Sequence, residues 1–301
     1  MENKAFETFL EENKIEYKRE EPMCNHTSFK IGGPADYFIS VRTEDELCLV
    51  LKELNLNKIP YFVLGKGSNL LVSDKGIEGA VISLACMDGV SVDGEKITAK
   101  AGTSLAGVCT AALENCLEGL EFAYGIPGCV GGALFMNAGA YGGEMSDVVT
   151  SADYVTEEGE KRTISLEDMQ LGYRESIFRK EKMIITSVTF ALGKGEKSEI
   201  RERMDDFMNR RKSKQPLEFP SAGSTFKRPE GNFAGALIEK NNLKGVSVGG
   251  AMVSEKHAGF VINYDRATSQ DVKNLMKLVQ KTVYDADGVT LEPEVIFVGK
   301  E

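Results

Sequence analysis

The sequence predicts an α+β fold of two domains, with a boundary near residue 205. Three observations support this prediction. The chain has 301 residues, about twice the length of a typical domain. Helical and strand patterns are interspersed along the chain without an internal repeat. A long amphipathic helix ends in a run of five residues, 210–214, that contains four basic side chains, and Pro216 prevents its continuation.

The composition excludes several classes of protein. The formal net charge of −10 disfavours general nucleic-acid binding. The N-terminus lacks the apolar segment of a signal peptide, and no stretch approaches the roughly 18 apolar residues of a membrane span. The six cysteines are scattered without a C-x-x-C pair, and His26 and His257 are the two histidines, so we expect no metal site and no disulfide framework. These features favour a reducing compartment, and we expect a cytoplasmic protein.

The first part of the chain predicts short helices and strands. Phe6, Phe9 and Leu10 share one helical face within residues 3–14. Thr43 and Glu46 have the spacing of a capping box and begin a second helix. Apolar runs then predict strands at 61–64, 81–84, 91–92 and 97–101, followed by a helix of small residues at 104–113.

The second part returns to strand-and-turn patterning over residues 150–194. Ser198 is the predicted cap of the long amphipathic helix. Beyond the boundary the pattern alternates again, with helices predicted at 233–240 and 269–284 and strands at 246–253, 260–263 and 291–298.

Two glycine-rich segments stand out. The strand at 61–64 runs directly into Gly-Lys-Gly-Ser-Asn-Leu, residues 65–70, whose N–H groups suit a pyrophosphate. This loop is neither G-x-G-x-x-G nor a P-loop, and a tight surface turn is its alternative interpretation. Residues 119–143 contain eight glycines, and within them 125–139 lead into a short helix. Close helix packing is the alternative there, but two such loops together favour one bound dinucleotide.

Five motifs in order resemble one family. They are residues 25–35, the loop 65–70, the segment 125–139, Ser-Ala-Gly-Ser-Thr-Phe-Lys-Arg-Pro at 221–229 and Leu-Glu-Pro-Glu-Val at 291–295. They resemble the UDP-N-acetylenolpyruvoylglucosamine reductases of peptidoglycan precursor synthesis. The resemblance implies a two-lobed FAD-binding domain of the vanillyl-alcohol-oxidase-like (PCMH-type) superfamily at 1–204, with lobes of about 1–80 and 81–204. A C-terminal α+β domain at 205–301 would then bind the UDP-sugar.

The resemblance also implies a reaction and three catalytic residues. NADPH would reduce FAD, and the enolpyruvyl ether of UDP-N-acetylglucosamine would receive a hydride at C3 and a proton at C2. Ser224 would donate the proton, Arg174 would hold the substrate carboxylate and stabilise the enolate, and Glu294 would polarise the enol or relay a proton. Taken without the family, Ser224 is a turn serine and Arg174 a solvated surface charge. Glu294 lies in an apolar strand, where alternation turns it to solvent or burial places it among apolar neighbours.

The binding residues follow from the same resemblance. We expect Arg211 and Lys214 to bind the UDP-sugar. The alternative is that the basic run only complements the helix dipole. Tyr173, Arg228 and His257 are further substrate-binding candidates. The residues implied for FAD, bound without a covalent link, are Gly65, Lys66, Gly67, Ser68, Asn69, Leu70, Gly125, Ile126, Pro127, Gly128, Gly131, Gly132, Asn137, Ala138, Gly139 and Ala140.

Two departures from the family pattern and two rival functions stay open. Some members carry asparagine at the position of Arg228, and the short stretch 180–197 resembles the subtype without an inserted, tyrosine-bearing loop. The first rival is another FAD-dependent oxidoreductase of the superfamily, such as a sugar or alcohol oxidase. The second is a flavin- or UDP-sugar-binding protein without catalysis. We expect a monomer with small-molecule substrates and no metal, nucleic-acid or membrane partner.

The mode of FAD attachment separates the family from the covalent oxidases. We predict that acid precipitation of the yellow protein releases all of its flavin into the supernatant. Absorbance of the two fractions measures this directly. Colour that stays in the pellet would support the oxidase alternative instead.

Overall fold

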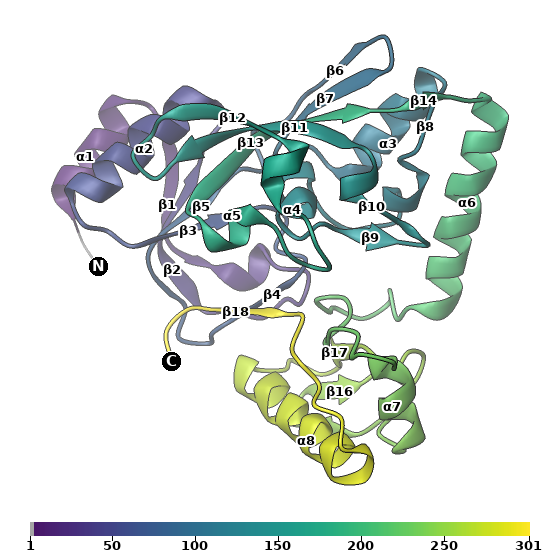
Figure 1. Ribbon diagram of the computed structural model, residues 1–301. Coiled ribbons are helices and arrows are strands. Elements are labelled where there is room, and N and C mark those ends of the chain that lie inside the picture. The colour runs from purple at the N-terminus through teal and green to yellow at the C-terminus, as the bar shows by residue number, and fades with distance from the viewer. Residues whose placement is uncertain (1–2) are drawn as a thin grey trace. The chain divides into compact units, whose positions relative to one another are not determined.

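The computed structural model describes residues 3–301, so Met1 and Glu2 of the predicted first lobe lie outside it (Figure 1). The chain forms two compact units. Unit 1 contains residues 3–19, 37–66 and 79–211, and unit 2 contains 20–36, 67–78 and 212–301. The predicted domains 1–204 and 205–301 are continuous stretches. The units are interleaved instead, because two segments of the N-terminal half pack with the C-terminal part.

The N-terminal part of unit 1 combines two helices with a sheet. Asn3 caps α1 (Lys4–Glu12) by accepting from the N–H of Phe6, and Thr43 caps α2 (Glu44–Leu56) by accepting from the N–H of Glu46. The Glu46 carboxylate accepts from the N–H of Arg42, whereas a capping box would use the N–H of Thr43. The second bond of the predicted capping box is therefore shifted by one residue. The sheet has the order β1 (Glu16–Pro22), β2 (Pro34–Ser40), β5 (Ile77–Ser83) and β3 (Tyr61–Leu64), with β3 and β5 parallel.

A five-stranded antiparallel sheet forms the rest of unit 1 (Figure 1). Its order is β12 (Lys161–Ser165), β11 (Val149–Thr156), β13 (Met183–Ala191), β7 (Lys96–Lys100) and β6 (Val90–Asp93). The shorter elements of this part are α3 (Leu105–Glu114), β8 (Leu117–Glu118), α4 (Val130–Phe135), β9 (Gly139–Ala140), β10 (Gly143–Glu144), α5 (Ile177–Lys180) and β14 (Gly193–Lys194).

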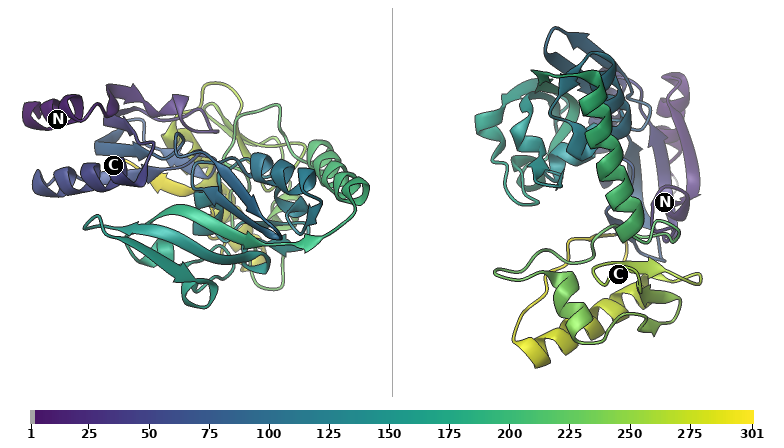
Figure 2. Two further views of the ribbon diagram at one scale, coloured as in Figure 1. Left: turned by 90° about the horizontal axis from the view of Figure 1, so that it is seen from above. Right: turned by 90° about the vertical axis from the view of Figure 1, so that its right-hand side faces the viewer.

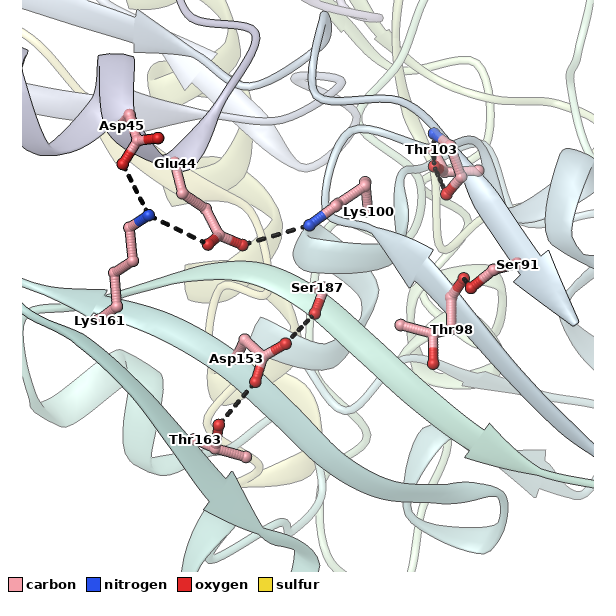
Figure 3. Close-up of polar contacts among 11 residues, drawn as sticks. Glu44, Asp45, Ser91, Thr98, Lys100, Thr103, Asp153, Lys161, Thr163 and Ser187 are labelled. Carbon is pink, nitrogen blue, oxygen red and sulfur yellow. Dashed lines mark hydrogen bonds and ion pairs between the residues drawn. The ribbon is translucent and has the colours of Figure 1, made fainter. Parts of the chain in front are cut away.

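Polar contacts hold the five-stranded sheet together and join it to α2 (Figure 3). Asp153 on β11 accepts from the hydroxyls of Thr163 on β12 (2.7 Å) and Ser187 on β13 (2.6 Å). Lys161 and Lys100 reach the first turn of α2, where Lys161 pairs with Asp45 at 2.7 Å and Lys100 with Glu44 at 3.2 Å. These acidic residues also complement the positive end of the helix dipole.

The predicted long helix is α6 (Lys197–Lys214), seen along its length in the right view of Figure 2. It begins one residue before the predicted cap Ser198, because the carbonyl of Glu196 already accepts from the N–H of Ile200. Arg203 fixes α6 to unit 1 by pairing with Glu118 at 2.7 Å and with the buried Glu121 at 2.6 Å. Its buried face carries Ile200 and Met204.

Unit 2 has its own core. It contains β4 (Leu70–Val72), α7 (Ala234–Lys240), β15 (Ser247–Val248), β16 (Ala251–Val253), β17 (Val261–Asn263), α8 (Ser269–Asp287) and β18 (Ile296–Val298). Phe29, Ile31 and Leu71 are buried in the same cluster as Leu275 and Val279 of α8. The early segments 20–36 and 67–78 are therefore part of this core.

Two predicted strands of unit 2 differ from the structure. The predicted strand 246–253 is a hairpin of β15 and β16, since Gly249 and Gly250 form the turn and Gly249 has φ of +54°. The predicted strand 291–298 is reduced to β18, which pairs in parallel with β4. Pro293 precedes it and has no N–H to donate to a ladder. Among the helices of residues 3–301, none is both long and apolar enough to cross a membrane.

Candidate active site

The first glycine loop follows β3 and needs glycine for packing reasons inside the protein. In unit 1, a Cβ on Gly65 would lie 2.6 Å from Sγ of Cys129. In unit 2, Gly67 has φ of +61°, and a Cβ there would overlap the carbonyl oxygen of His26. Lys66 is exposed, and neither its side chain nor that of Ser68 has a hydrogen bond or ion pair within residues 3–301. These two polar groups are available to an anion.

Asn69 ends this loop and is tied to the strand that follows Glu294. Its backbone carbonyl accepts from the N–H of Ile296 at 3.0 Å. Its side-chain Nδ2 donates to the backbone carbonyl of Glu294 at 3.1 Å. These bonds therefore connect Asn69, a residue predicted to bind FAD, with the segment of Glu294, a residue predicted to be catalytic.

The second glycine segment packs against the five-stranded sheet. The N–H groups of Val130 and Gly131 donate to the carbonyls of Thr103 and Ala101, both at 2.9 Å. A Cβ on Gly131 would lie 2.9 Å from Cβ of Ala101. Two N–H groups at the start of α4 are thus used inside the protein. Packing alone explains glycine at this position, and its contact with FAD stays a prediction.

A hairpin continues this segment. β9 and β10 are joined by Tyr141 and Gly142, which both have positive φ, and such turns favour asparagine and glycine. The Tyr141 ring stacks on Phe207 of α6 with 4.7 Å between ring centres and an interplanar angle of 1°. This stacking fixes the hairpin against the helix that carries Arg211.

Arg174 lies in a four-residue turn, 172–175, closed by reciprocal hydrogen bonds between Gly172 and Glu175. It has φ of +57°, a conformation that costs a long side chain energy and is often found at functional sites. Its Nη2 lies 3.5 Å from the carbonyl oxygen of Gly139, and its guanidinium lies 5.0 Å from the centre of the exposed Tyr173 ring. The guanidinium of Arg179 donates to the carbonyl of Arg174.

Arg211 differs from its neighbour in the basic run. Arg210 pairs with Asp206 one helical turn earlier, at 2.7 Å. Arg211 is half-buried, and no carboxylate pairs with it in the described part of the chain. Its Cδ lies so close to Gly125 that a Cβ there would be 3.2 Å away. Burial lowers the pKa of the Arg211 guanidinium, as expected for a cation held without an anion.

In unit 2, Ser224 and Glu294 lie on two paired segments. Phe226 and Pro293 form an antiparallel bridge, flanked by bonds from the N–H of Lys227 to Glu292 and from the N–H of Glu294 to Thr225, at 2.8 and 2.9 Å. Ser224 is exposed, and its hydroxyl has no partner within residues 3–301. Glu294 is half-buried, between the two alternatives that the sequence left open.

The remaining predicted substrate residues of unit 2 lie on different elements. Lys214 is the exposed last residue of α6, and Arg228 stacks over the Phe233 ring at 4.7 Å from its centre. Nδ1 of His257 accepts from the N–H of Gly259 at 3.1 Å. Burial lowers the pKa of His257, and the positive charges of Lys244 and Lys214 lower it further. Lys214 and His257 are therefore near enough to interact electrostatically.

Sequence patterns did not reveal every residue that supports the site. Arg179 lies in no motif, and its bond supports the turn of Arg174 five residues earlier. Cys129 lies within the segment 125–139 but has no predicted role, and its contact with Gly65 joins segments far apart in the chain. No group of three or more possible metal ligands occurs among residues 3–301. The crowded glycines, the unpaired polar groups of Lys66 and Ser68 and the unpaired Arg211 fit anionic, dinucleotide-like ligands such as FAD and a UDP-sugar.

Comparison with known proteins agrees with these features. Residues 35–165 match the FAD binding domain, and residues 215–298 match the C-terminal domain of UDP-N-acetylenolpyruvoylglucosamine reductase. A solved structure, Physcomitrella patens BBE-like 1 variant D396N, shares the fold over 63% of this chain, with a TM-score of 0.51 and 13% identity. The fold and the matched domains define an FAD-binding reductase of the PCMH-type fold.

Similarity over nearly the whole chain narrows the class to one family. The reductase of Clostridium novyi is 49% identical over 299 residues, 99% of this chain and 97% of that protein. The reductase of Caldanaerobacter subterraneus is 50% identical over 281 residues, 93% of each. The crystal structure from Thermus caldophilus has a TM-score of 0.80 at 35% identity and covers 94% of this chain and 98% of its own. The chain belongs to the UDP-N-acetylenolpyruvoylglucosamine reductase family.

The packing of α4 gives a stability prediction. Gly131→Ala places a methyl group against Ala101 and should destabilise the FAD-free protein by about 1–3 kcal/mol. Gly132→Ala is a matched control in the same helix, because its Cβ would lie 3.5 Å from Sγ of Cys129 in ordinary contact. Urea unfolding of both variants checks this. Equal unfolding free energies would contradict the packing explanation.

The lowered pKa of His257 gives a pH prediction. The folded state favours the neutral ring, so the unfolded chain binds the proton more readily. The stabilisation is complete above the ordinary histidine pKa of about 6.5 and is lost as the pH falls through the lowered pKa of the folded state.

His257→Asn should therefore reduce the loss of unfolding free energy between about pH 7 and pH 5, measured by urea unfolding. Between about pH 8 and pH 9 the two proteins should show the same slope, which serves as the control. An unchanged slope at acid pH would show that His257 does not contribute.

Proposed function

We propose that this protein reduces UDP-N-acetylglucosamine enolpyruvate to UDP-N-acetylmuramate with NADPH, through non-covalently bound FAD. The enzyme would be an FAD-dependent oxidoreductase of the class that acts on a CH–CH group with NADP as acceptor. In the direction proposed here, the enolpyruvyl C=C is reduced to CH–CH and NADPH is oxidised to NADP. The reaction belongs to peptidoglycan precursor synthesis. We further propose that it takes place in the cytoplasm and that the enzyme is a monomer. Family membership and the FAD-binding domain support the reaction type.

One observation carries the chemical proposal. The Phe226–Pro293 bridge holds Ser224, with an exposed hydroxyl, on a segment paired with the one that bears Glu294. A proton donor must be accessible to the bound substrate, and its hydroxyl must be held in a fixed direction. A serine hydroxyl is a weak acid, so the paired carboxyl group would support the transfer by polarising the enol or relaying the proton.

Each charged residue has a role in this proposal. Hydride addition at C3 places negative charge on C2 and the adjacent carboxylate. Arg174 would hold that carboxylate and stabilise the enolate, and Ser224 would protonate C2. FAD, when bound, supplies the hydride that NADPH provides. Gly65–Leu70 and the segment 125–140 would hold it, with Lys66 and Ser68 as side-chain donors.

The UDP-sugar would bind through the basic run. Arg211 is half-buried without a carboxylate partner, and an anionic ligand would compensate its charge. Lys214 would contact the diphosphate, and Tyr173, Arg228 and His257 would contribute further contacts. Arg210 takes no part, since Asp206 already neutralises it.

The role of Ser224 can be tested by separating the two half-reactions under anaerobic conditions. Ser224→Ala should be reduced by NADPH at the rate of the unaltered protein. Its reoxidation by the enolpyruvyl sugar should be slower by about 10²–10⁴-fold, the usual contribution of a general acid. Stopped-flow absorbance of the flavin measures both rates.

Ser247→Ala, at an exposed serine on β15, is the matched control and should leave both rates unchanged. Reoxidation of Ser224→Ala at nearly the normal rate would show that another group protonates C2.

A further inference from the structure

We propose that Asn137, which the family resemblance implies for FAD, is a positioning residue for Arg174. The inference rests on the proposed function, because it takes Arg174 as the residue that holds the substrate carboxylate. Every residue in the argument belongs to unit 1.

The side chain of Asn137 is enclosed and fully used within the protein. The residue has no exposed surface. Its Nδ2 donates to the carbonyl of Gly172 at 3.1 Å, and its Oδ1 accepts from the N–H of Ser146 at 3.0 Å. The side-chain amide is therefore closed to a ligand, and the predicted contact of Asn137 with FAD cannot come from it.

Three bonds connect the segment around Asn137 with the turn of Arg174. Asn137 donates to Gly172, the hydroxyl of Ser176 donates to the carbonyl of Phe135 at 2.7 Å, and the guanidinium of Arg174 points to Gly139. Of these three bonds, the Asn137 bond is made by a fully buried side-chain amide. It reaches Gly172, the first residue of the turn. The same Gly172 carbonyl also accepts from the N–H of Glu175, which closes the turn.

The chemistry of asparagine suits this position. Asn137 has φ of +41°, and after glycine asparagine is the residue that best tolerates a left-handed conformation. The amide supplies one donor and one acceptor in opposite directions. Glycine would keep the backbone but lose both bonds, and aspartate would keep the acceptor and place a negative charge against a carbonyl oxygen.

The positive φ of Arg174 explains why such support is needed. A left-handed arginine relaxes to an ordinary conformation unless its surroundings hold it. Releasing Gly172 would let the turn relax and move the guanidinium without removing it. Loss of Asn137 should therefore weaken what Arg174 does and leave what other residues do unchanged.

The test uses Asn137→Gly in the flavin-loaded protein. Gln170→Gly is the matched control, because Gln170 also has positive φ, at +49°, and lies two residues before Gly172. Gln170 is exposed and follows the short 3-10 helix Leu166–Met169 as its C-cap. The first measurement is hydrogen exchange of residues 172–176. We expect faster exchange at Glu175 in Asn137→Gly and no change in Gln170→Gly.

The second measurement is binding of UDP-N-acetylmuramate, which carries the carboxylate, compared with UDP-N-acetylglucosamine, which does not. Asn137→Gly should lose about tenfold in its preference for the carboxylate ligand, with an unchanged FAD content and unchanged affinity for UDP-N-acetylglucosamine. In an Arg174→Ala background the same substitution should cause no further loss, since the two residues act as a unit.

Unaltered exchange at 172–176, an equal loss in the Arg174→Ala background, or a loss of FAD would each overturn the proposal. The exchange measurement does not depend on the reaction. If the unaltered protein fails to reduce the enolpyruvyl sugar, the proposed function fails, and exchange still decides whether Asn137 holds the turn.

Discussion

The structure depends on backbone segments that approach each other more closely than a side chain would allow. Cβ atoms at Gly65 and Gly131 would lie 2.6 Å from Cys129 and 2.9 Å from Ala101, within unit 1. In unit 2 Gly67 is equally crowded by His26. The glycines that suggest a ligand loop are therefore required first by packing. The neighbouring side chains of Lys66 and Ser68 have no hydrogen bond or ion pair within residues 3–301, and we propose that they meet the anion.

Each glycine segment also supports a residue that we propose to be catalytic. Asn69, at the end of the first, bonds to the backbone of Glu294, and Asn137, at the end of the second, bonds to the turn of Arg174. Within each unit, the segment predicted to hold the cofactor thus sets the position of a charged side chain. A cofactor loop and a catalytic side chain that share hydrogen bonds cannot shift independently.

The sequence predicted the elements whose signals are local. The helices α2, α6 and α8 follow from apolar periodicity and caps, with small errors at their ends. The split of 246–253 at Gly249 and the shortening of 291–298 at Pro293 depended on turn and proline chemistry that a period count overlooks. The interleaving of the units left no pattern, because contacts between distant segments create no periodicity. The contrast between the paired Arg210 and the unpaired Arg211 likewise needed the positions of Asp206 and Gly125.

We propose that these residues form an FAD-dependent reductase for an enolpyruvyl UDP-sugar. The most direct measurement is a single anaerobic turnover of the unaltered protein, with the flavin spectrum and the products followed together. We predict that NADPH bleaches the flavin, that UDP-N-acetylglucosamine enolpyruvate restores its colour, and that one UDP-N-acetylmuramate forms for each flavin. Flavin that NADPH bleaches but that the enolpyruvyl sugar leaves reduced would contradict the claim.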